Sequence, residues 1–187
     1  MRRFRLLTLS GVIAHVPLRR RHARATLESM TLGVVMLGLV AAVHPIPRLV
    51  WNVSASAPLG LYGVVPHAVF ARGDLVLAAL PRAARALAAE RGYLPSGVPV
   101  VKHVAALAGD SVCSRGMIIT INGRPVTERL AADMHGRALP GWRGCQTLRP
   151  GQVFLLNAAV PDSFDGRYFG PVERSAIIGK LVAIWTR

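Results

Sequence analysis

The sequence predicts a mainly β domain preceded by one N-terminal apolar helix. Three observations favour this class: residues 29–43 contain no charged side chain, short apolar runs from Trp51 onward are broken by Gly and Pro, and Asn122-Gly123 lies between two alternating apolar segments. The chain has 187 residues, of which 52% are hydrophobic. It is therefore large enough for one small domain with its own core, and too apolar for an intrinsically disordered basic protein.

The N-terminal segment is strongly basic. Seven arginines lie within the first 24 residues, and the whole chain has a net charge of +14. Because positively charged segments stay on the cytoplasmic side of a membrane, residues 1–28 are expected to be a cytoplasmic N-terminus. The apolar stretch Leu6–Leu18 is short and is interpreted as cytosolic or interfacial.

The next element, residues 29–49, is predicted to be a transmembrane anchor. A spanning helix needs about 20 apolar residues, and this segment provides them if Arg48 snorkels to the interface. Two alternatives stay open: a buried core helix, and a cleaved signal peptide for which Ser54-Ala55-Ser56 is a weak cleavage site.

Residues 50–187 are predicted to form the folded domain. One helix is expected at 82–91, because Pro81 suits a first turn and Gly92 suits a helix end. Residues 129–150 have no clear period and are interpreted as an irregular excursion within a small insertion at about 113–148. Strands are expected at 60–65, 74–79, 98–106, 117–121, 125–128, 153–156 and 180–186.

The chain contains two cysteines, Cys113 and Cys145, with no CxxC motif and no histidine at a zinc-like spacing. No metal and no cofactor are expected. In an oxidising compartment one disulfide is the simplest expectation, and in the chain-entropy model it stabilises the fold by roughly 3–4 kcal/mol. A nucleophilic cysteine is the alternative, which only the nearby Arg115 supports.

Lysine is rare in this chain: 21 of the 23 basic residues are arginines, and the two lysines are Lys102 and Lys180. Strand alternation in 98–106 places Lys102 on the same face as Val100 and Val104. Burial lowers the pKa of a lysine, and a neutral lysine can act as a general base that activates a serine hydroxyl. An edge-strand lysine that opposes aggregation is the open alternative.

A serine-containing turn follows the predicted anchor. In residues 52–62 (NVSASAPLGLY), Pro58 and Gly60 restrict the backbone to a turn that enters a strand, which would expose a small hydroxyl at a fixed angle. The sequence contains no GxSxG, SxxK, HExxH, Walker A or GxGxxG motif. Most simple hydrolases, metalloproteases and nucleotide-binding proteins are thereby excluded.

Three motifs in order resemble those of the bacterial type I signal peptidases. They are Ser56-x-Pro58, then Lys102-His103-Val104-x-x-Leu107-x-Gly109-Asp110, and finally Asp162-Ser163-Phe164-Asp165-Gly166-Arg167-Tyr168. The resemblance covers roughly residues 30–187, and the form around the serine is most similar to the conjugative-transfer branch, the TraF-type pilin peptidases. It implies a signal-peptidase-like β core with a short disulfide-tethered insertion.

The resemblance also implies roles for individual residues. Ser56 would be the nucleophile and Lys102 the general base of a serine-lysine dyad. The supporting residues would be Ser54, which helps to hold the oxyanion, Ser163, which orients the lysine, and the buried ion pair Asp165–Arg167, for which a purely structural role is the alternative.

The sequence departs from the ordinary signal peptidase pattern in three places. Ala57 stands where methionine is usual, His103 replaces an arginine, and Gly166 replaces the serine of the closing motif. The first change fits the conjugative branch. His103 is expected on the opposite strand face from Lys102 and is not proposed as a catalytic residue.

The implied function is that of a membrane-anchored serine endopeptidase, with its catalytic domain in the periplasm and its anchor in the bacterial inner membrane. Its partner would be a pilin-like or signal-peptide-bearing precursor, which is cleaved and, in some members of the branch, cyclised. A general type I signal peptidase is the alternative. A nucleic-acid-binding protein, suggested by the pI of about 11.6, is disfavoured because aromatic residues are few and the arginines of the body are dispersed.

Overall fold

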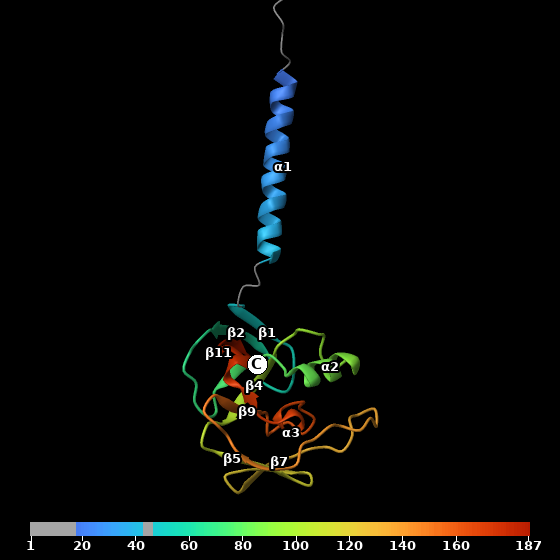
Figure 1. The fold of residues 1–187 in the computed structure, drawn as a ribbon, viewed down its shortest axis with the longest axis vertical. Coiled ribbons are helices and arrows are strands. Elements are labelled where there is room, and N and C mark those ends of the chain that lie inside the picture. The colour runs from blue at the N-terminus through green and yellow to red at the C-terminus, as the bar shows by residue number, and fades with distance from the viewer. Residues whose placement is uncertain (1–17, 43–46) are drawn as a thin grey trace, which may run out of the picture. The chain divides into compact units, whose positions relative to one another are not determined.

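The computed structural model describes residues 18–42 and 47–187, which belong to two separate units, Met1–Pro45 and Ile46–Arg187. The predictions for residues 1–17, including nearly all of the apolar stretch Leu6–Leu18, lie outside the described residues. Figure 1 shows a long helix in the first unit and a β-rich body in the second.

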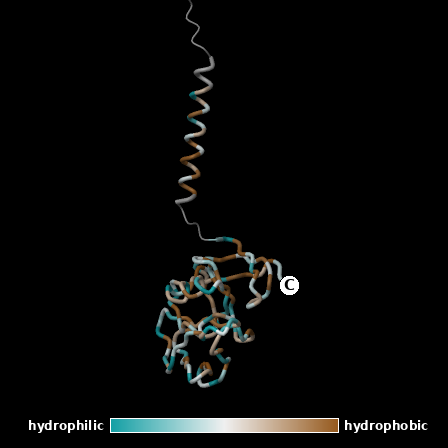
Figure 2. Tube along the Cα trace, turned by 90° about the vertical axis from the view of Figure 1, so that its right-hand side faces the viewer, coloured by the Kyte–Doolittle hydropathy of each residue, from teal (hydrophilic) through white to brown (hydrophobic). Residues whose placement is uncertain are grey.

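The helix of the first unit, α1, spans Leu18–Ala42 and contains the predicted apolar segment. Its 18-residue window Ala23–Val40 has a mean hydropathy of 1.3. Figure 2 shows that the apolar residues gather toward the C-terminal end of this helix. By length and composition α1 can cross a membrane, as can the apolar segment of a signal peptide.

Both ends of α1 differ from the predicted boundaries. The helix begins at Leu18, inside the segment predicted to be the basic N-terminus, because arginine, alanine and leucine are strong helix formers. Leu49, the last residue of the predicted anchor range, is the first residue of strand β1.

The body contains a seven-stranded sheet in the order β1-β2-β11-β3-β4-β9-β10, in which all neighbours are antiparallel. The chain crosses this sheet repeatedly, so strands far apart in sequence become neighbours: β11 lies between β2 and β3 (Figure 1). The strands are β1 Leu49–Asn52, β2 Gly60–Val65, β3 Leu75–Ala78, β4 Val100–Ala106, β9 Gln152–Leu156, β10 Val172–Glu173 and β11 Ile177–Thr186.

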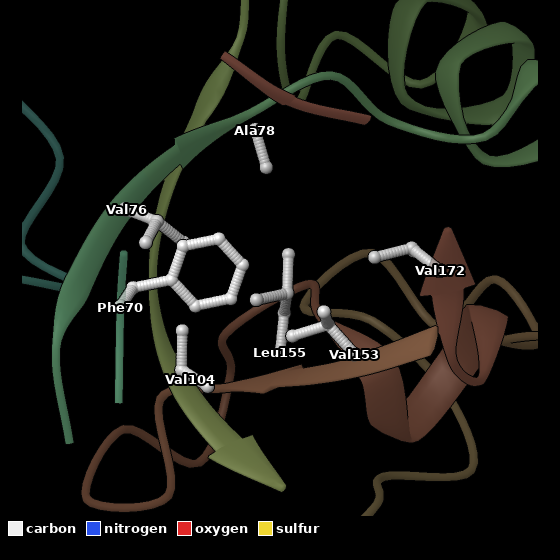
Figure 3. Packing of buried hydrophobic residues seen from close by; sticks show 7 residues of the cluster. All are labelled: Phe70, Val76, Ala78, Val104, Val153, Leu155 and Val172. Carbon is white, nitrogen blue, oxygen red and sulfur yellow. The ribbon is translucent and has the colours of Figure 1, made fainter. Parts of the chain in front are cut away.

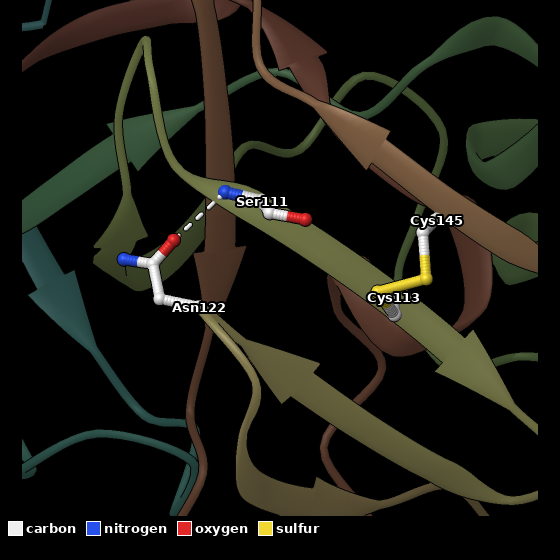
Figure 4. Close-up of a disulfide and its surroundings, with 4 residues drawn as sticks. All are labelled: Ser111, Cys113, Asn122 and Cys145. Carbon is white, nitrogen blue, oxygen red and sulfur yellow. Dashed lines mark hydrogen bonds between the residues drawn. A yellow bond between two sulfur atoms is a disulfide. The ribbon is translucent and has the colours of Figure 1, made fainter.

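A four-stranded antiparallel sheet, β7-β6-β5-β8, lies within residues 111–147, where a small insertion was expected. Its hairpin turns at Asn122-Gly123, where both residues have positive φ angles of 51° and 79°, as a type I′ turn requires. The predicted disulfide Cys113–Cys145 is present and joins directly opposed residues of β5 and β8 (Figure 4). The strands are β5 Ser111–Arg115, β6 Ile118–Ile121, β7 Arg124–Glu128 and β8 Gly144–Thr147.

Three short helical segments complete the body. The predicted helix is α2, Arg82–Glu90, which begins after Pro81 and packs Ala84 and Ala88 into the core. The other two are α3, Gly166–Phe169, and the 3₁₀ turn η1, Arg174–Ala176.

Both faces of the large sheet are buried in its middle, as β3 illustrates. Its successive residues alternate between two clusters: Val76 and Ala78 pack in one, and Leu77 packs in the other. Figure 3 shows that Val104 of β4 and Leu155 of β9 join the first cluster. The middle of the sheet, and β4 in particular, is therefore held rigidly by packing on both sides.

The interpretation of residues 129–150 as an irregular excursion was wrong in part. Its last residues form β8, which pairs with β5 and carries Cys145. All four residues of β8 are exposed, so no apolar alternation marks the strand in the sequence. Strands β1, β5 and β10 and helix α3 were also not predicted, because they are short or polar.

Candidate active site

The turn predicted to present a serine is a loop between β1 and β2, and Asn52 organises it. The buried amide of Asn52 donates hydrogen bonds to the carbonyl oxygens of Ser54, Ala57 and Pro58 at 3.0–3.1 Å, and its Oδ1 accepts the Ser54 N–H. The loop ends at Gly60, where a Cβ atom would lie 2.1 Å from the carbonyl oxygen of Trp185. The backbone on both sides of Ser56 is thus fixed by local contacts.

Within this loop the two serines lie side by side. The Oγ atoms of Ser54 and Ser56 are 2.9 Å apart, and the Ser56 N–H points toward Ser54 Oγ at 3.4 Å. Ser54 is exposed and Ser56 is half-buried. A hydroxyl and a backbone N–H therefore lie next to Ser56 Oγ, and an oxyanion site uses donors of these two kinds.

Lys102 comes from the middle of β4 and is only 4% exposed. Its Nζ atom lies 2.6 Å from Ser163 Oγ and 3.5 Å from Ser56 Oγ. Burial lowers the pKa of Lys102 from 10.5 to about 8, and the nearby charge of Arg167 also lowers it, against an opposing effect of Asp165. A substantial fraction of this amine is therefore neutral near physiological pH.

The closing motif supplies Ser163 to the lysine, and its Asp165 and Arg167 side chains are completely buried. Arg167 forms a bidentate pair with Asp165, with Nε to Oδ1 at 2.8 Å and Nη2 to Oδ2 at 3.1 Å. The guanidinium also donates to the carbonyl oxygens of Asn157, Pro161 and Glu128. A buried charge pair satisfied in this way fixes the backbone around it, and Ser163 with it.

Two departures from the family pattern have structural reasons. At Gly166 a Cβ atom would lie 2.6 Å from the carbonyl oxygen of Leu155 and 2.8 Å from the Phe154 ring, so no larger residue fits there. The His103 ring lies 2.9 Å, through Nδ1, from the carbonyl oxygen of Gly73 and does not contact Ser56 or Lys102 in the structure.

Asn157 was missed by the sequence prediction. It is 3% exposed, follows β9 directly and contacts both halves of the site. Its Nδ2 donates to the carbonyl oxygen of Ser56 at 2.5 Å and to that of Val101 at 3.2 Å. A single asparagine after a strand is an ordinary loop signal, and nothing in the sequence marked it.

A cleft of about 760 Å³ opens over Ser56 and Lys102. Residues 130–139 contribute one side of it through Leu130, Asp133, Met134, His135 and Leu139. Tyr93 Oη donates a hydrogen bond to Asp133 Oδ2, which ties the segment to the loop after α2. Arg137 Nε donates to the same oxygen from within the segment. The rest of the lining is mainly apolar and includes Val53, Leu80, Leu94, Val98, Val100, Val101, Val160 and Phe164.

The structure thus brings four predicted residues into contact, Ser54, Ser56, Lys102 and Ser163, and places the Asp165–Arg167 pair behind them. Cys113 and Cys145 belong to the four-stranded sheet and do not line the cleft. Within residues 18–42 and 47–187, no three His, Cys, Asp or Glu side chains converge to hold a metal ion. The cluster has the groups needed for nucleophilic attack on a carbonyl with proton transfer to an amine.

Comparison with known proteins agrees with this chemistry. A protein-family model described as "Signal peptidase, peptidase S26" matches residues 21–186. The "Probable conjugal transfer protein TraF" of Sinorhizobium fredii is 32% identical over 187 residues, which covers 90% of this chain and 93% of the relative. The "Plasmid transfer protein TraF" of Escherichia coli is 36% identical over 145 residues, covering 72% and 81% respectively.

Among solved structures, a signal peptidase I from Enterococcus faecalis is 23% identical and covers 62% of this chain and 98% of its own, with a TM-score of 0.38. The family match, over residues 21–186, covers most of the described body and all three motifs. This chain belongs to the signal peptidase family, peptidase S26.

Proposed function

We propose that this protein is a membrane-anchored serine endopeptidase that processes an exported precursor, a conjugative pilin, through a Ser56–Lys102 dyad. The observation that carries the proposal is the position of Lys102 Nζ between the hydroxyls of Ser56 and Ser163, together with a pKa of about 8 for its buried amine. A lysine with such a pKa can remove a proton from a serine hydroxyl near neutral pH.

In the first step, neutral Lys102 accepts the proton of Ser56 while Oγ attacks the scissile carbonyl carbon of the precursor. The negative charge moves to the carbonyl oxygen, where the Ser56 N–H and the Ser54 hydroxyl would donate to it. Ser163 would hold the lysine amine in line with Ser56 Oγ during the transfer. In this assignment Asp165 and Arg167 support the site by fixing the closing motif.

In the second step, the tetrahedral intermediate collapses and Lys102 returns the proton to the leaving amine. The product is released, and the remaining acyl group is bound to Ser56 as an ester. Water then attacks the ester and regenerates the serine. If the amino terminus of the bound acyl chain itself attacks in place of water, a new peptide bond forms, Ser56 is released as the free hydroxyl and the product is cyclic.

The proposed topology places residues 1–28 in the cytoplasm, 29–49 in the inner membrane and 50–187 in the periplasm. The basic N-terminal segment, the exposed apolar helix α1 and the Cys113–Cys145 disulfide support it, since disulfides persist in oxidising compartments. Enzyme and substrate anchored in the same bilayer meet at a high effective concentration.

The names of the relatives, which are conjugal and plasmid transfer proteins, support a pilin precursor as the substrate. A general type I signal peptidase is the competing assignment. A panel of unrelated signal-peptide precursors separates the two: a dedicated enzyme processes the cognate pilin and few or none of the panel, whereas a general one processes most of them.

The dyad is tested by Ser56→Ala and Lys102→Arg, with processing followed by mass spectrometry of the precursor. Both variants are expected to be folded, membrane-inserted and inactive, because arginine keeps the charge of lysine but cannot accept a proton at neutral pH. Lys180→Arg is the matched control: Lys180 pairs with Asp74 at 2.8 Å, and arginine preserves that ion pair. Processing that survives in either dyad variant would rule out this mechanism.

A further inference from the structure

Asn157 contacts the nucleophile loop and the strand of the general base at the same time. Its Nδ2 uses both hydrogens, one on the carbonyl oxygen of Ser56 and one on that of Val101. Its Oδ1 accepts the His103 N–H at 3.1 Å. The amide therefore binds Ser56 directly and also binds both backbone neighbours of Lys102.

The main chain of Asn157 is fixed by the closing motif. Its N–H donates to Asp165 Oδ2 at 3.0 Å, and its carbonyl oxygen accepts Arg167 Nη2 at 2.9 Å. The buried ion pair thus fixes the backbone of Asn157. The side-chain amide of Asn157 in turn fixes Ser56 relative to β4.

We propose that Asn157 is the positioning residue of this active site, which sets the distance between Ser56 Oγ and Lys102 Nζ by clamping the nucleophile loop onto β4. The proposal rests on the proposed dyad. Ser56 and Lys102 are 46 residues apart in sequence and come from separate elements, and the direct contact between them, at 3.5 Å, is too long to hold them together. Hydrogen bonds through a buried, fully used amide provide the missing constraint.

The clamp also explains how an exposed loop can carry a well-placed nucleophile. The side-chain hydrogen bonds of Asn52 all stay within the loop and shape it internally. Asn157 supplies the contact to β4, through its hydrogen bond to the carbonyl oxygen of Ser56. Loss of the Asn157 amide should therefore leave the shape of the loop intact but allow the loop to move relative to β4. A displacement of about 1 Å in a reacting group can reduce the rate by about 100-fold.

The experiment compares Asn157→Ala and Asn157→Asp with wild type. The aspartate variant keeps an acceptor for the His103 N–H but loses the two hydrogen bonds that the amide donates, and the alanine variant loses all three. Because both variants lose the donated bonds, both are expected to lower kcat by about 100-fold with KM changed less than about threefold. The aspartate variant is also expected to shift the pH profile to higher pH, because an added carboxylate raises the pKa of Lys102.

The matched control is Asn122→Gly. Asn122 accepts the Ser111 N–H at 2.8 Å and donates to Asp110 at 2.8 Å, so this variant loses the hydrogen bonds of a structural asparagine in the other sheet (Figure 4). Glycine tolerates the positive φ at this position. This control is expected to lower stability while leaving kcat unchanged.

Amide hydrogen exchange provides a readout that does not depend on catalysis. Faster exchange in residues 54–57 of Asn157→Ala, with unchanged exchange in β3 and β9, supports the clamp even if the wild-type enzyme processes no precursor and the proposed function fails. A kcat within about threefold of wild type, or exchange that rises equally across the sheet, overturns the clamp.

Discussion

The two segments that meet at Lys102 are built in opposite ways. The nucleophile loop, residues 52–58, is shaped by neutral hydrogen bonds from Asn52 and leaves Ser54 exposed. The closing segment, residues 157–167, is organised around an ion pair with no exposed surface. The loop must expose its serine to a substrate. The closing segment must shield the amine of Lys102 from water, because burial lowers the pKa of that amine.

This contrast predicts that changes in the closing segment affect folding first, whereas changes in the loop affect the rate first.

The largest effect is expected for Arg167→Ala. It leaves Asp165 buried without its partner and is expected to lower the free energy of unfolding by about 3–5 kcal/mol. Denaturant unfolding measures this change. Lys180→Ala is the control, because it removes a partly exposed ion pair with Asp74 and is expected to cost less than about 1 kcal/mol. If both variants lose the same free energy of unfolding, the buried ion pair has no special role in stabilising the closing segment.

The next effect is expected for Ser54→Ala, in the loop. It removes the hydroxyl 2.9 Å from Ser56 Oγ and is expected to lower kcat by about 100-fold while leaving the midpoint of thermal unfolding unchanged. Ser96→Ala, at an exposed loop position, is the control for removal of a serine hydroxyl. If kcat is retained in Ser54→Ala, the assigned oxyanion role is incorrect.

The third effect concerns Lys102 and, unlike the other two, vanishes at high pH. Its folded-state pKa of about 8 lies below the ordinary 10.5, so the unfolded chain binds more protons between these values and stability rises with pH across that window. Below pH 8 the buried ammonium of Lys102 lowers the free energy of unfolding by on the order of 3 kcal/mol at most. Lys102→Met is expected to be more stable than wild type at pH 7, with a gain that shrinks toward pH 10.5.

The same pKa makes a kinetic prediction for the wild-type enzyme. The value of kcat/KM is expected to rise with pH up to about 8 and to level off above it, because the neutral amine is the active form. A stability gain in Lys102→Met that is independent of pH, or a flat pH profile between 6 and 9, would argue against a titrating Lys102.

The sequence predicted those parts of the molecule that short motifs specify. The Asn122-Gly123 hairpin, helix α2 and most long strands follow from local patterns, and the disulfide follows from having two cysteines. Ser56 and Lys102 stood out because a proline-glycine turn and a rare lysine are visible without a structure. Strand β8 was not predictable in this way, since its four exposed residues are held by pairing with β5 rather than by an apolar face.

Asn157 could not be predicted, for a related reason. Its importance depends on contacts with Ser56 and Val101, which lie 101 and 56 residues away in sequence. An asparagine at the end of a strand has the same local signature whether it binds water or joins two catalytic segments. The cleft lining was likewise invisible, because it combines residues from 47 to 168 that share no sequence pattern.

The near absence of lysine has a chemical consequence for anyone who labels this protein. The chain offers two side-chain amines: Lys180 is held in an ion pair by Asp74, and Lys102 lies in the cleft with a pKa of about 8. Neutral amines are acylated, whereas ammonium ions are not. A small acylating reagent at pH 8 should therefore mark Lys102 in preference to Lys180, and a bound substrate should protect it, so that the mass of the proteolytic peptide that contains Lys102 becomes a direct gauge of active-site occupancy.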